Sequence, residues 1–457
     1  MNKTDVCSTV AVVGILGLAY WFATPQAPRL SARVPIPDNN PTTAAVRASE
    51  NTNQGTLIRG TGKASREPGN WPQFRGANRD GVAEGVIASS WPPEGPKLVW
   101  RVQLGDGHAG AAVRNGRVYV TDYDEEKKED AIRCLSFDTG EEIWRYTYYV
   151  KVKRYHGMSR TVPAVTENRV VSLGPLCHVR CLDAESGELV WKKDLVADYQ
   201  ANVPEWYAGQ CPLVDGGRVI LAPGGSCMMT ALDPLTGKTI WETPNPESWQ
   251  MTHSSILPIS FEGKRQYVWC STRGAVGVDA ETGSVLWKLP EWQVRIATVP
   301  SPVDAGEGRI FFAGGYNSGS MMIQLARQGD RIVPKEVFRT KPDVFGSDQQ
   351  TPIFYNGFIY GVVPGGRLAC LSLEGKRLWL SSEVNFGLGP YLMIGGKMLL
   401  LRDNPCELYL FEVGPNGARK LASRRVLDGH DAWAPMAFVN GRVLLRDATT
   451  MLCLDLR

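Results

Sequence analysis

The chain has 457 residues, enough for one large domain or several average ones, and its 50 basic and 47 acidic residues leave a formal net charge of +3. This balance, without any cluster of Lys or Arg, excludes a surface that would hold nucleic acid or an anionic membrane by charge. Glycine (48 residues) and tryptophan (14 residues) are frequent, while long apolar stretches of helical period are missing. The composition therefore favours many short strands joined by turns.

Residues 6–23 form an uncharged apolar run, VCSTVAVVGILGLAYWFA. As a helix this run would span about 27 Å, just enough for a thin bilayer core. We therefore expect residues 1–24 to be either an uncleaved membrane anchor, with Tyr20 and Trp21 at the interface, or a cleaved signal peptide. Both alternatives place the rest of the chain in the cell envelope, either anchored with a periplasmic domain or secreted to the periplasm. Membrane contact is expected through this segment only.

Residues 25–70 are rich in Pro, Ala, Thr, Asn and Ser and poor in large apolar side chains. Such a segment buries too little surface to offset the entropy lost on ordering. The sequence therefore predicts a flexible linker over 25–70, followed by one domain over 71–457.

One pattern recurs from residue 97 onward at a spacing of about 40 to 50 residues, the range of propeller blades. Its clearest copy is CLDAESGELVW at 181–191, which describes a strand, a turn opened by Asp183 and a second strand. Glycine supplies the positive φ of the turn, and tryptophan four residues later is expected to pack against the neighbouring blade. These residues are interpreted as structural; they are Gly140, Gly187, Gly237, Gly283, Gly375, Trp144, Trp191, Trp241, Trp287 and Trp379.

A second hairpin precedes each copy, with Asn-Gly or Gly-Gly at the centre of alternating apolar runs. Two hairpins make one four-stranded antiparallel blade. The predicted blades start near Ala111, Pro163, Pro212, Ser255, Ser301, Thr351, Pro390 and Pro435. The sequence thus predicts an all-β, eight-bladed propeller, with seven blades as the alternative because the blades after Ser301 and Pro390 lack the tryptophan signature.

The last copy ends at residues 451–457 without its outer strand, and an unmatched strand with the same kind of tryptophan, Trp100, lies at 96–104. We expect the N- and C-terminal strands to complete one blade together, which closes the ring without an exposed edge.

The frame A/C-L-D-x-x-T/S-G-x-x-x-W resembles the repeat of the pyrroloquinoline-quinone (PQQ)-type propeller family. That repeat is shared by quinoprotein dehydrogenases and by the BamB-type accessory protein of outer-membrane assembly. The preceding NWPQFRGANRDGVAEG, at 70–85, resembles a segment found before such propellers in exported bacterial proteins, notably in planctomycetes. The resemblance specifies the fold well and the activity poorly.

The cysteines point to packing rather than chemistry. Cys134, Cys181, Cys370 and Cys453 share one frame position, occupied elsewhere by Ala or Gly, which indicates a small buried residue. The CHVRC spacing from Cys177 lacks a second cluster of ligands, so no metal site is predicted. The resemblance implies a vicinal cysteine pair and calcium ligands in alcohol-oxidising quinoproteins. This chain has no adjacent cysteines, and no calcium ligands could be matched.

Polar and aromatic side chains gather in the loops that lead into the first strand of each blade, which share one rim of a propeller. We predict that a small molecule or a protein partner binds there, with polar loops of no function as the competing interpretation. The candidate residues are His108, His156, Arg160, Trp206, Tyr207, Gln210, His253, Arg295, Asp348, Gln349, His430, Asp431 and Trp433.

Three functions are compatible with the sequence. The preferred one is a non-enzymatic binding or scaffolding propeller that requires no cofactor. The alternatives are a PQQ-dependent oxidoreductase and a hydrolase or lyase that uses the histidines of the rim. Neither paired carboxylates nor a Ser/His/Asp spacing supports the last.

Overall fold

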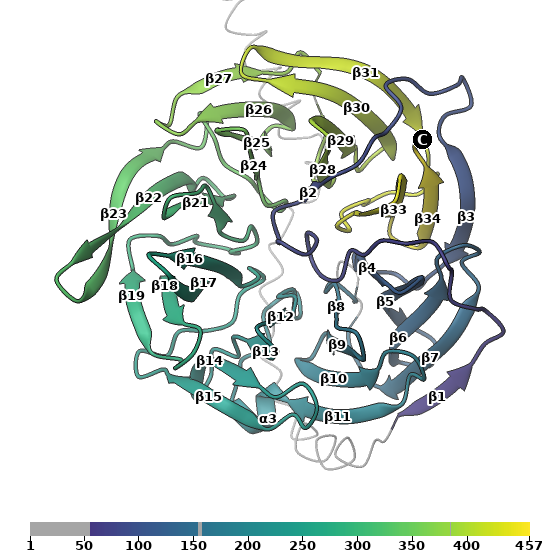
Figure 1. Ribbon diagram of the computed structural model, residues 1–457, viewed down its shortest axis with the longest axis horizontal. Helices are drawn as coiled ribbons and strands as arrows, with labels where there is room; N and C mark the ends of the chain where they lie inside the picture. The colour runs from purple at the N-terminus through teal and green to yellow at the C-terminus, as the bar shows by residue number, and fades with distance from the viewer. Residues whose placement is uncertain (1–54, 154–157, 384) are drawn as a thin grey trace, which may run out of the picture. The chain divides into compact units, whose positions relative to one another are not determined.

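The computed structural model describes residues 55–153, 158–383 and 385–457, and its strands form eight sheets arranged in a ring (Figure 1). Each sheet has four antiparallel strands, in chain order in seven of the eight sheets, and two sheets carry one further strand at an edge. The prediction of an eight-bladed propeller is confirmed, and the seven-bladed alternative is wrong. Among the described residues the one α-helix is α3 (Leu195–Tyr199), whose first backbone N–H groups are capped by Asp194.

Every predicted blade start lies within three residues of an inner strand. From the channel outward, the first four blades consist of β4 (Ala111–Arg114), β5 (Arg117–Asp124), β6 (Glu129–Ser136) and β7 (Glu142–Tyr149); β8 (Ala164–Val165), β9 (Arg169–Leu173), β10 (His178–Asp183) and β11 (Leu189–Asp194); β12 (Leu213–Asp215), β13 (Arg218–Leu221), β14 (Cys227–Leu232) and β15 (Thr239–Pro244); and β16 (Leu257–Phe261), β17 (Lys264–Ser271), β18 (Gly274–Asp279) and β19 (Val285–Leu289).

The remaining blades follow the same order, and the last takes its outer strand from the start of the chain. They consist of β20 (Val303–Asp304), β21 (Arg309–Gly314), β22 (Gly319–Gln328) and β23 (Arg331–Thr340); β24 (Ile353–Tyr355), β25 (Phe358–Val363), β26 (Arg367–Ser372) and β27 (Arg377–Leu380); β28 (Tyr391–Ile394), β29 (Lys397–Leu401), β30 (Glu407–Gly414) and β31 (Gly417–Arg425); and β32 (Ala437–Val439), β33 (Arg442–Arg446), β34 (Thr450–Asp455) and β3 (Lys97–Gln103).

The ring closes through β3, which pairs antiparallel with β34 and places Trp100 opposite Cys453. The predicted closure by the two ends of the propeller is therefore confirmed. The same cross-strand pair recurs as Cys181 opposite Trp191, with a β-bulge immediately after it. The indole explains why this frame position holds a small residue: a β-carbon on Gly277 would lie 2.2 Å from the ring of Trp287.

The outer-strand tryptophans join neighbouring blades. The indole N–H of Trp191 donates to the carbonyl of Pro234 in the next blade at 3.0 Å, and the turn glycine Gly237 lies against the ring. Trp100, Trp241 and Trp379 make the equivalent bond to the following blade, with Phe137, Ala280 and Gly414 as acceptors.

The fifth blade departs from this pattern. Its outer hairpin has no Asp-x-x-Thr-Gly turn, and the indole N–H of Trp287 in the fourth blade donates instead to Gln266 of that same blade at 2.7 Å. Phe338 takes the tryptophan position opposite Met322, and Gly375 of the sixth blade lies against its ring. A phenylalanine fills the same space without donating a hydrogen bond. The sequence pattern missed this position because the pattern requires a tryptophan there.

The segment predicted as a linker over 25–70 is paired to the propeller over the part that the structure describes. Strand β1 (Thr56–Arg59) extends the first blade along the outer edge of β7, and Gly60 and Gly62 donate to Ile143 and Glu142. Strand β1 thus lies within the stretch that the sequence assigned to the linker. Backbone hydrogen bonds along an open strand edge order a chain that has few apolar side chains to bury.

The predicted anchor or signal peptide, residues 1–24, lies outside the described residues. Among the residues that the structure does describe, no helix is long and apolar enough to cross a membrane.

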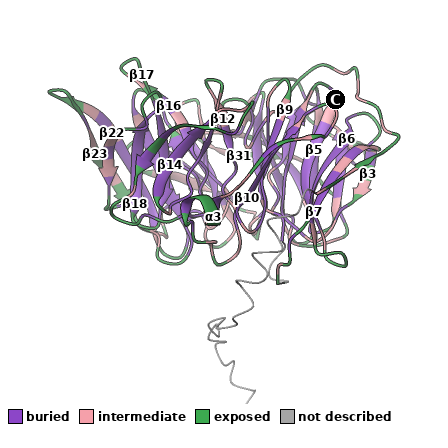
Figure 2. Ribbon diagram, turned by 90° about the horizontal axis from the view of Figure 1, so that it is seen from below, coloured by how far each residue is buried: buried purple, intermediate pink, exposed green. Residues whose placement is uncertain are grey.

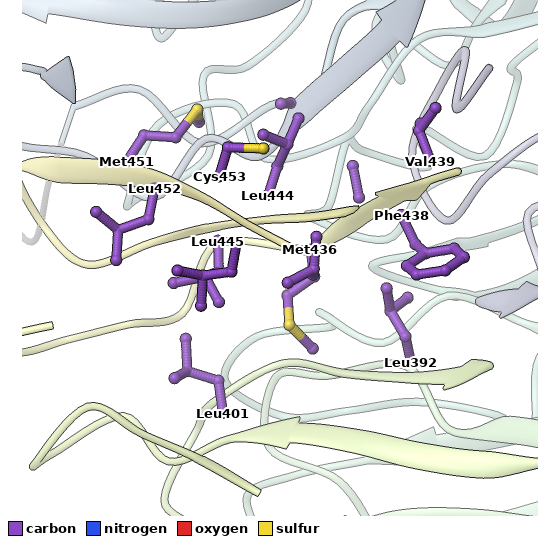
Figure 3. Packing of buried hydrophobic residues seen from close by; sticks show 14 of the residues in the cluster. Leu392, Leu401, Met436, Phe438, Val439, Leu444, Leu445, Met451, Leu452 and Cys453 are labelled. Carbon is purple, nitrogen blue, oxygen red and sulfur yellow. The ribbon is translucent and has the colours of Figure 1, made fainter. Parts of the chain in front are cut away.

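The core lies between the blades. Strand interiors are buried and the loops at both ends are exposed (Figure 2). Between the seventh and eighth blades, Leu392 and Leu401 belong to the same buried cluster as Met436, Phe438 and Leu445 (Figure 3). All cysteines among the described residues are free and buried, including the four at the shared frame position, for which burial was predicted.

Candidate functional site

One end of the central channel is crossed by residues 71–83, which we call the plug (Figure 1). Trp71 exchanges two backbone hydrogen bonds of 2.8 Å with Val113 near the end of β4, and the N–H of Val165 donates to Pro72 in the plug. Strand β2 (Val82–Ala83) then runs parallel to the end of β28. These partners lie at the carboxyl ends of inner strands, so the plug covers that end of the channel.

Arg75 of the plug extends into the channel as a buried cation. Its guanidinium donates to the carbonyls of Thr351 at 2.6 Å, Pro352 at 2.8 Å, Asp80 at 2.6 Å and Arg79 at 3.2 Å. Burial lowers the pKa of Arg75 to about 10, while Tyr391 and Asp80 act in the opposite direction. The side chain therefore stays protonated at neutral pH, with its charge held mainly by neutral carbonyl oxygens.

A cavity of about 350 Å³ occupies the channel beyond the plug. Six of the predicted rim residues line it, namely His108, Arg160, Trp206, His253, Gln349 and Trp433. Further lining residues that were not predicted for the rim are Phe74, Arg75, Ser255, Val299, Ser301, Thr351, Leu388, Pro390 and Met436. The loops before the inner strands supply most of the rim, at the opposite end of these strands from the plug.

Aromatic and histidine rings surround the cavity. The rings of His108 and Trp433 lie 4.6 Å apart, and those of Trp206 and His253 lie 6.2 Å apart. The indole N–H of Trp433 donates to a carboxylate oxygen of Asp403 at 3.0 Å, which fixes its orientation.

Charge in the cavity comes from arginine. Burial, assisted by the nearby charge of Arg160, lowers the pKa of His253 to about 4, so this imidazole is neutral at pH 7. Burial also lowers the pKa of Arg160, to about 10, which leaves the guanidinium protonated. Arg75 and Arg160 are thus the cations of the described lining.

Three hydroxyl groups on adjacent blades form what we call the hydroxyl arc: Ser255, Ser301 and Thr351. Each oxygen accepts a backbone N–H from the preceding blade, donated by Cys211 at 3.0 Å, by Ser255 at 3.0 Å and by Ser301 at 2.9 Å. A hydroxyl that accepts in this way still has its own hydrogen to donate. A weak sequence signal existed, because Ser301 and Thr351 each precede the proline that begins an inner strand.

Several predicted rim residues do not line this cavity. The hydroxyl of Tyr207 is bound to the backbone of Lys153, and the amide of Gln210 is fully buried on the backbone of Ala222. Both are structural contacts that hold a loop or strand in place.

Charged candidates also lie elsewhere. Arg295 is exposed, and His430 forms an exposed pair with Asp431, with 3.1 Å between Nδ1 and Oδ2. Asp348 lines a smaller adjacent cavity, where burial raises its pKa. His156 lies outside the described residues. Chain distance to a strand therefore brought six of the candidate residues to one cavity but could not tell which side chains turn inward.

The PQQ-type resemblance raises the question of a calcium-bound quinone. The donor set does not fit one: the lining side chains that the structure describes include no Asp or Glu. Calcium is held by oxygen ligands, with carboxylates prominent among them. The side chains around this cavity therefore do not support a calcium-bound quinone.

The fold and the cavity define a PQQ-type eight-bladed propeller whose channel is plugged at one end and lined by aromatic and cationic groups at the other. A family model described as outer membrane protein assembly factor BamB matches residues 83–172 and 128–381. The chain belongs to this family.

Curated relatives carry the same description. The BamB of Moranella endobia (strain PCIT) is 24% identical over 300 residues, which cover 62% of this chain and 62% of the relative. The BamB of Yersinia pestis is 21% identical over 336 residues, covering 62% of this chain and 81% of the relative. The chain thus matches less than two thirds of the length of the Moranella relative.

Solved structures share the fold. BamB from Moraxella catarrhalis aligns with a TM-score of 0.57 at 12% identity, over 79% of this chain and 99% of that one. Quinohemoprotein alcohol dehydrogenase from Comamonas testosteroni aligns with a TM-score of 0.61 at 14% identity, over 85% and 81% of the two chains. At these identities the similarity concerns the fold alone.

Proposed function

We propose that this protein is a non-enzymatic binding propeller of the cell envelope, which holds a protein partner at the open end of its channel. The observation that carries the proposal is the asymmetry of the channel. The plug occupies one end, whereas His253, Trp206 and Trp433 line the cavity beyond it.

The family supports this proposal. Relatives in it are named as outer membrane protein assembly factors, a name that describes action on other proteins. Binding pockets of proteins are concave, mostly apolar and fitted with a few polar groups, which is the composition of this lining. Aromatic residues and arginine also contribute most to binding energy at protein interfaces.

The test is affinity capture of the full-length protein from cross-linked envelope membranes, followed by quantitative mass spectrometry. Wild type is compared with His253→Ala and Trp206→Ala at the cavity. Ile240→Ala serves as the matched control, because Ile240 is exposed on the outer strand β15, far along its blade from the channel.

We expect a partner that wild type and Ile240→Ala retain and that both cavity variants lose by at least tenfold. The proposal would be overturned if all four proteins retained the same set of partners, or if none retained a partner above background. Circular dichroism of each variant must match wild type, so that lost binding is not lost folding.

A further inference from the structure

We propose that the cavity receives the C-terminal end of a partner polypeptide, with the terminal carboxylate at the hydroxyl arc and Arg75 and the last side chains against the apolar wall. This inference rests on the proposed function and specifies which part of the partner is bound.

The first argument is the shape of the site. The plug blocks passage through the channel, so a bound chain must enter and stop. A loop has to enter and leave through the same opening, whereas a chain end enters once. A cavity of about 350 Å³ lies near the lower limit of ligand pockets, which suits a few residues of extended chain rather than a folded surface.

The second argument is charge. The described lining carries two guanidinium groups, Arg75 and Arg160, and no carboxylate. Arg75 is only 7% exposed and is held by carbonyl oxygens at the inner end of the cavity. A buried cation with no carboxylate beside it in the cavity attracts an anionic ligand. The attraction is stronger where water is excluded, because the local dielectric constant is lower.

The third argument is hydrogen bonding. The oxygens of Ser255, Ser301 and Thr351 already accept backbone N–H groups, and the hydroxyls of Ser301 and Thr351 keep their hydrogen to offer. Within the described part of the chain, no acceptor is bound to the hydroxyl hydrogen of Ser301 or Thr351. A ligand group with several lone pairs can accept hydrogen bonds from these hydroxyls together, and a carboxylate has about four acceptor sites. An uncharged amide terminus replaces one of its two oxygens by a donor and fits less well.

The fourth argument is the rest of the lining, much of which is apolar and forms what we call the apolar wall. Val299, Leu388, Pro390 and Met436 line the cavity together with Trp206 and Trp433. These side chains bury the apolar side chains of an entering peptide, in the way that peptide-binding domains pair a pocket for the carboxylate with pockets for side chains. The predicted ligand is therefore a C-terminus with apolar last residues.

The experiment measures binding of N-acetylated tripeptides to the full-length protein by calorimetry. The peptides end in Leu, Phe or Val, and each is made as the free acid and as the C-terminal amide. 3-Phenylpropionate is the small-acid probe. Protein variants are Ser301→Ala, its conservative counterpart Ser301→Thr, and the control Ser260→Ala, since Ser260 is exposed on β16.

We expect at least one peptide acid to bind at least tenfold tighter than its amide. Ser301→Ala should weaken binding of that peptide acid at least fivefold and leave binding of the amide nearly unchanged. Ser301→Thr and Ser260→Ala should bind the acid with wild-type affinity. Equal binding of acid and amide overturns the inference, as does absence of binding by every peptide. Binding of 3-phenylpropionate without any peptide assigns the site to a small acid and also overturns it.

These results are separable from the proposed function. A partner captured by wild type and lost by His253→Ala, combined with no preference for acids, leaves the binding propeller standing and removes the carboxylate site. If peptide acids bind but no envelope partner is captured, the carboxylate site stands and the proposal of an envelope-binding propeller is removed.

Discussion

Gly237 and Trp191 meet across the boundary between two blades: a β-carbon on Gly237 would lie 2.7 Å from Cδ2 of the indole. The glycine also has a φ of +68°, which side chains disfavour. One residue thus meets two requirements, a turn of positive φ and room for the tryptophan of the preceding blade.

Gly237→Ala is expected to lower the free energy of unfolding by more than the cost of the left-handed backbone conformation alone. The left-handed conformation costs a non-glycine residue about 1–2 kcal/mol, and the contact with Trp191 adds about 1–3 kcal/mol of overpacking. Gly263→Ala is the matched control, because Gly263 has a φ of +74° with nothing within 4 Å. Urea denaturation of both variants measures the difference, and equal losses would show that the indole contact contributes nothing.

Arg75→Met should weaken the attachment of the plug. Methionine keeps much of the volume but removes donors to the carbonyls of Thr351 and Pro352, and hydrogen bonds to charged groups are each worth about 1.5–3 kcal/mol. We expect a loss of at least about 3 kcal/mol in the free energy of unfolding and faster proteolysis within residues 71–83. The exposed Arg59→Met should change stability by less than about 1 kcal/mol. If the Arg75→Met protein were as stable and as resistant to protease as wild type, Arg75 would not be what attaches the plug.

Stability should depend on pH through His253. The native pKa of about 4 lies below the ordinary value of 6.5, so between these values the unfolded chain binds a proton that the native protein does not. Stability is therefore fully present above about pH 6.5 and falls as the pH decreases toward 4. His253→Gln should flatten this part of the profile. A profile unchanged by His253→Gln would argue against a buried neutral imidazole.

The frame cysteines should resist alkylation in the native protein. Burial raises the pKa of Cys181, Cys370 and Cys453 to about 12, and the thiolate is the reactive form. At pH 8 iodoacetamide is expected to label them only after unfolding in guanidinium, as followed by peptide mass spectrometry. Rapid labelling of native protein at these positions would mean that the outer hairpins open.

Added PQQ and calcium are expected to give no dye-linked oxidation of alcohols or sugars. The lining described by the structure lacks carboxylates to hold the calcium ion. Activity that a chelator removes and that His253→Ala abolishes would reverse this expectation and favour an oxidoreductase.

The sequence alone determined the repeat, and with it the number of blades, their starts and the closure of the ring by β3 and β34. These follow from local rules, because turn residues, alternation and a tryptophan at fixed spacing act within a few residues of each other. The tryptophan signature is missing where another residue takes its position, as Phe338 does in the fifth blade and Ala422 in the seventh.

Only the tertiary structure decided the rest. That residues 71–83 close the channel depends on bonds between Arg75 and Thr351, 276 positions apart, which no local pattern encodes. The hydroxyl arc likewise needs three blades side by side, because each oxygen accepts from the blade before it. Local spacing placed His253 and Tyr207 in equivalent loops, but only packing decided that the first faces the cavity and the second binds backbone.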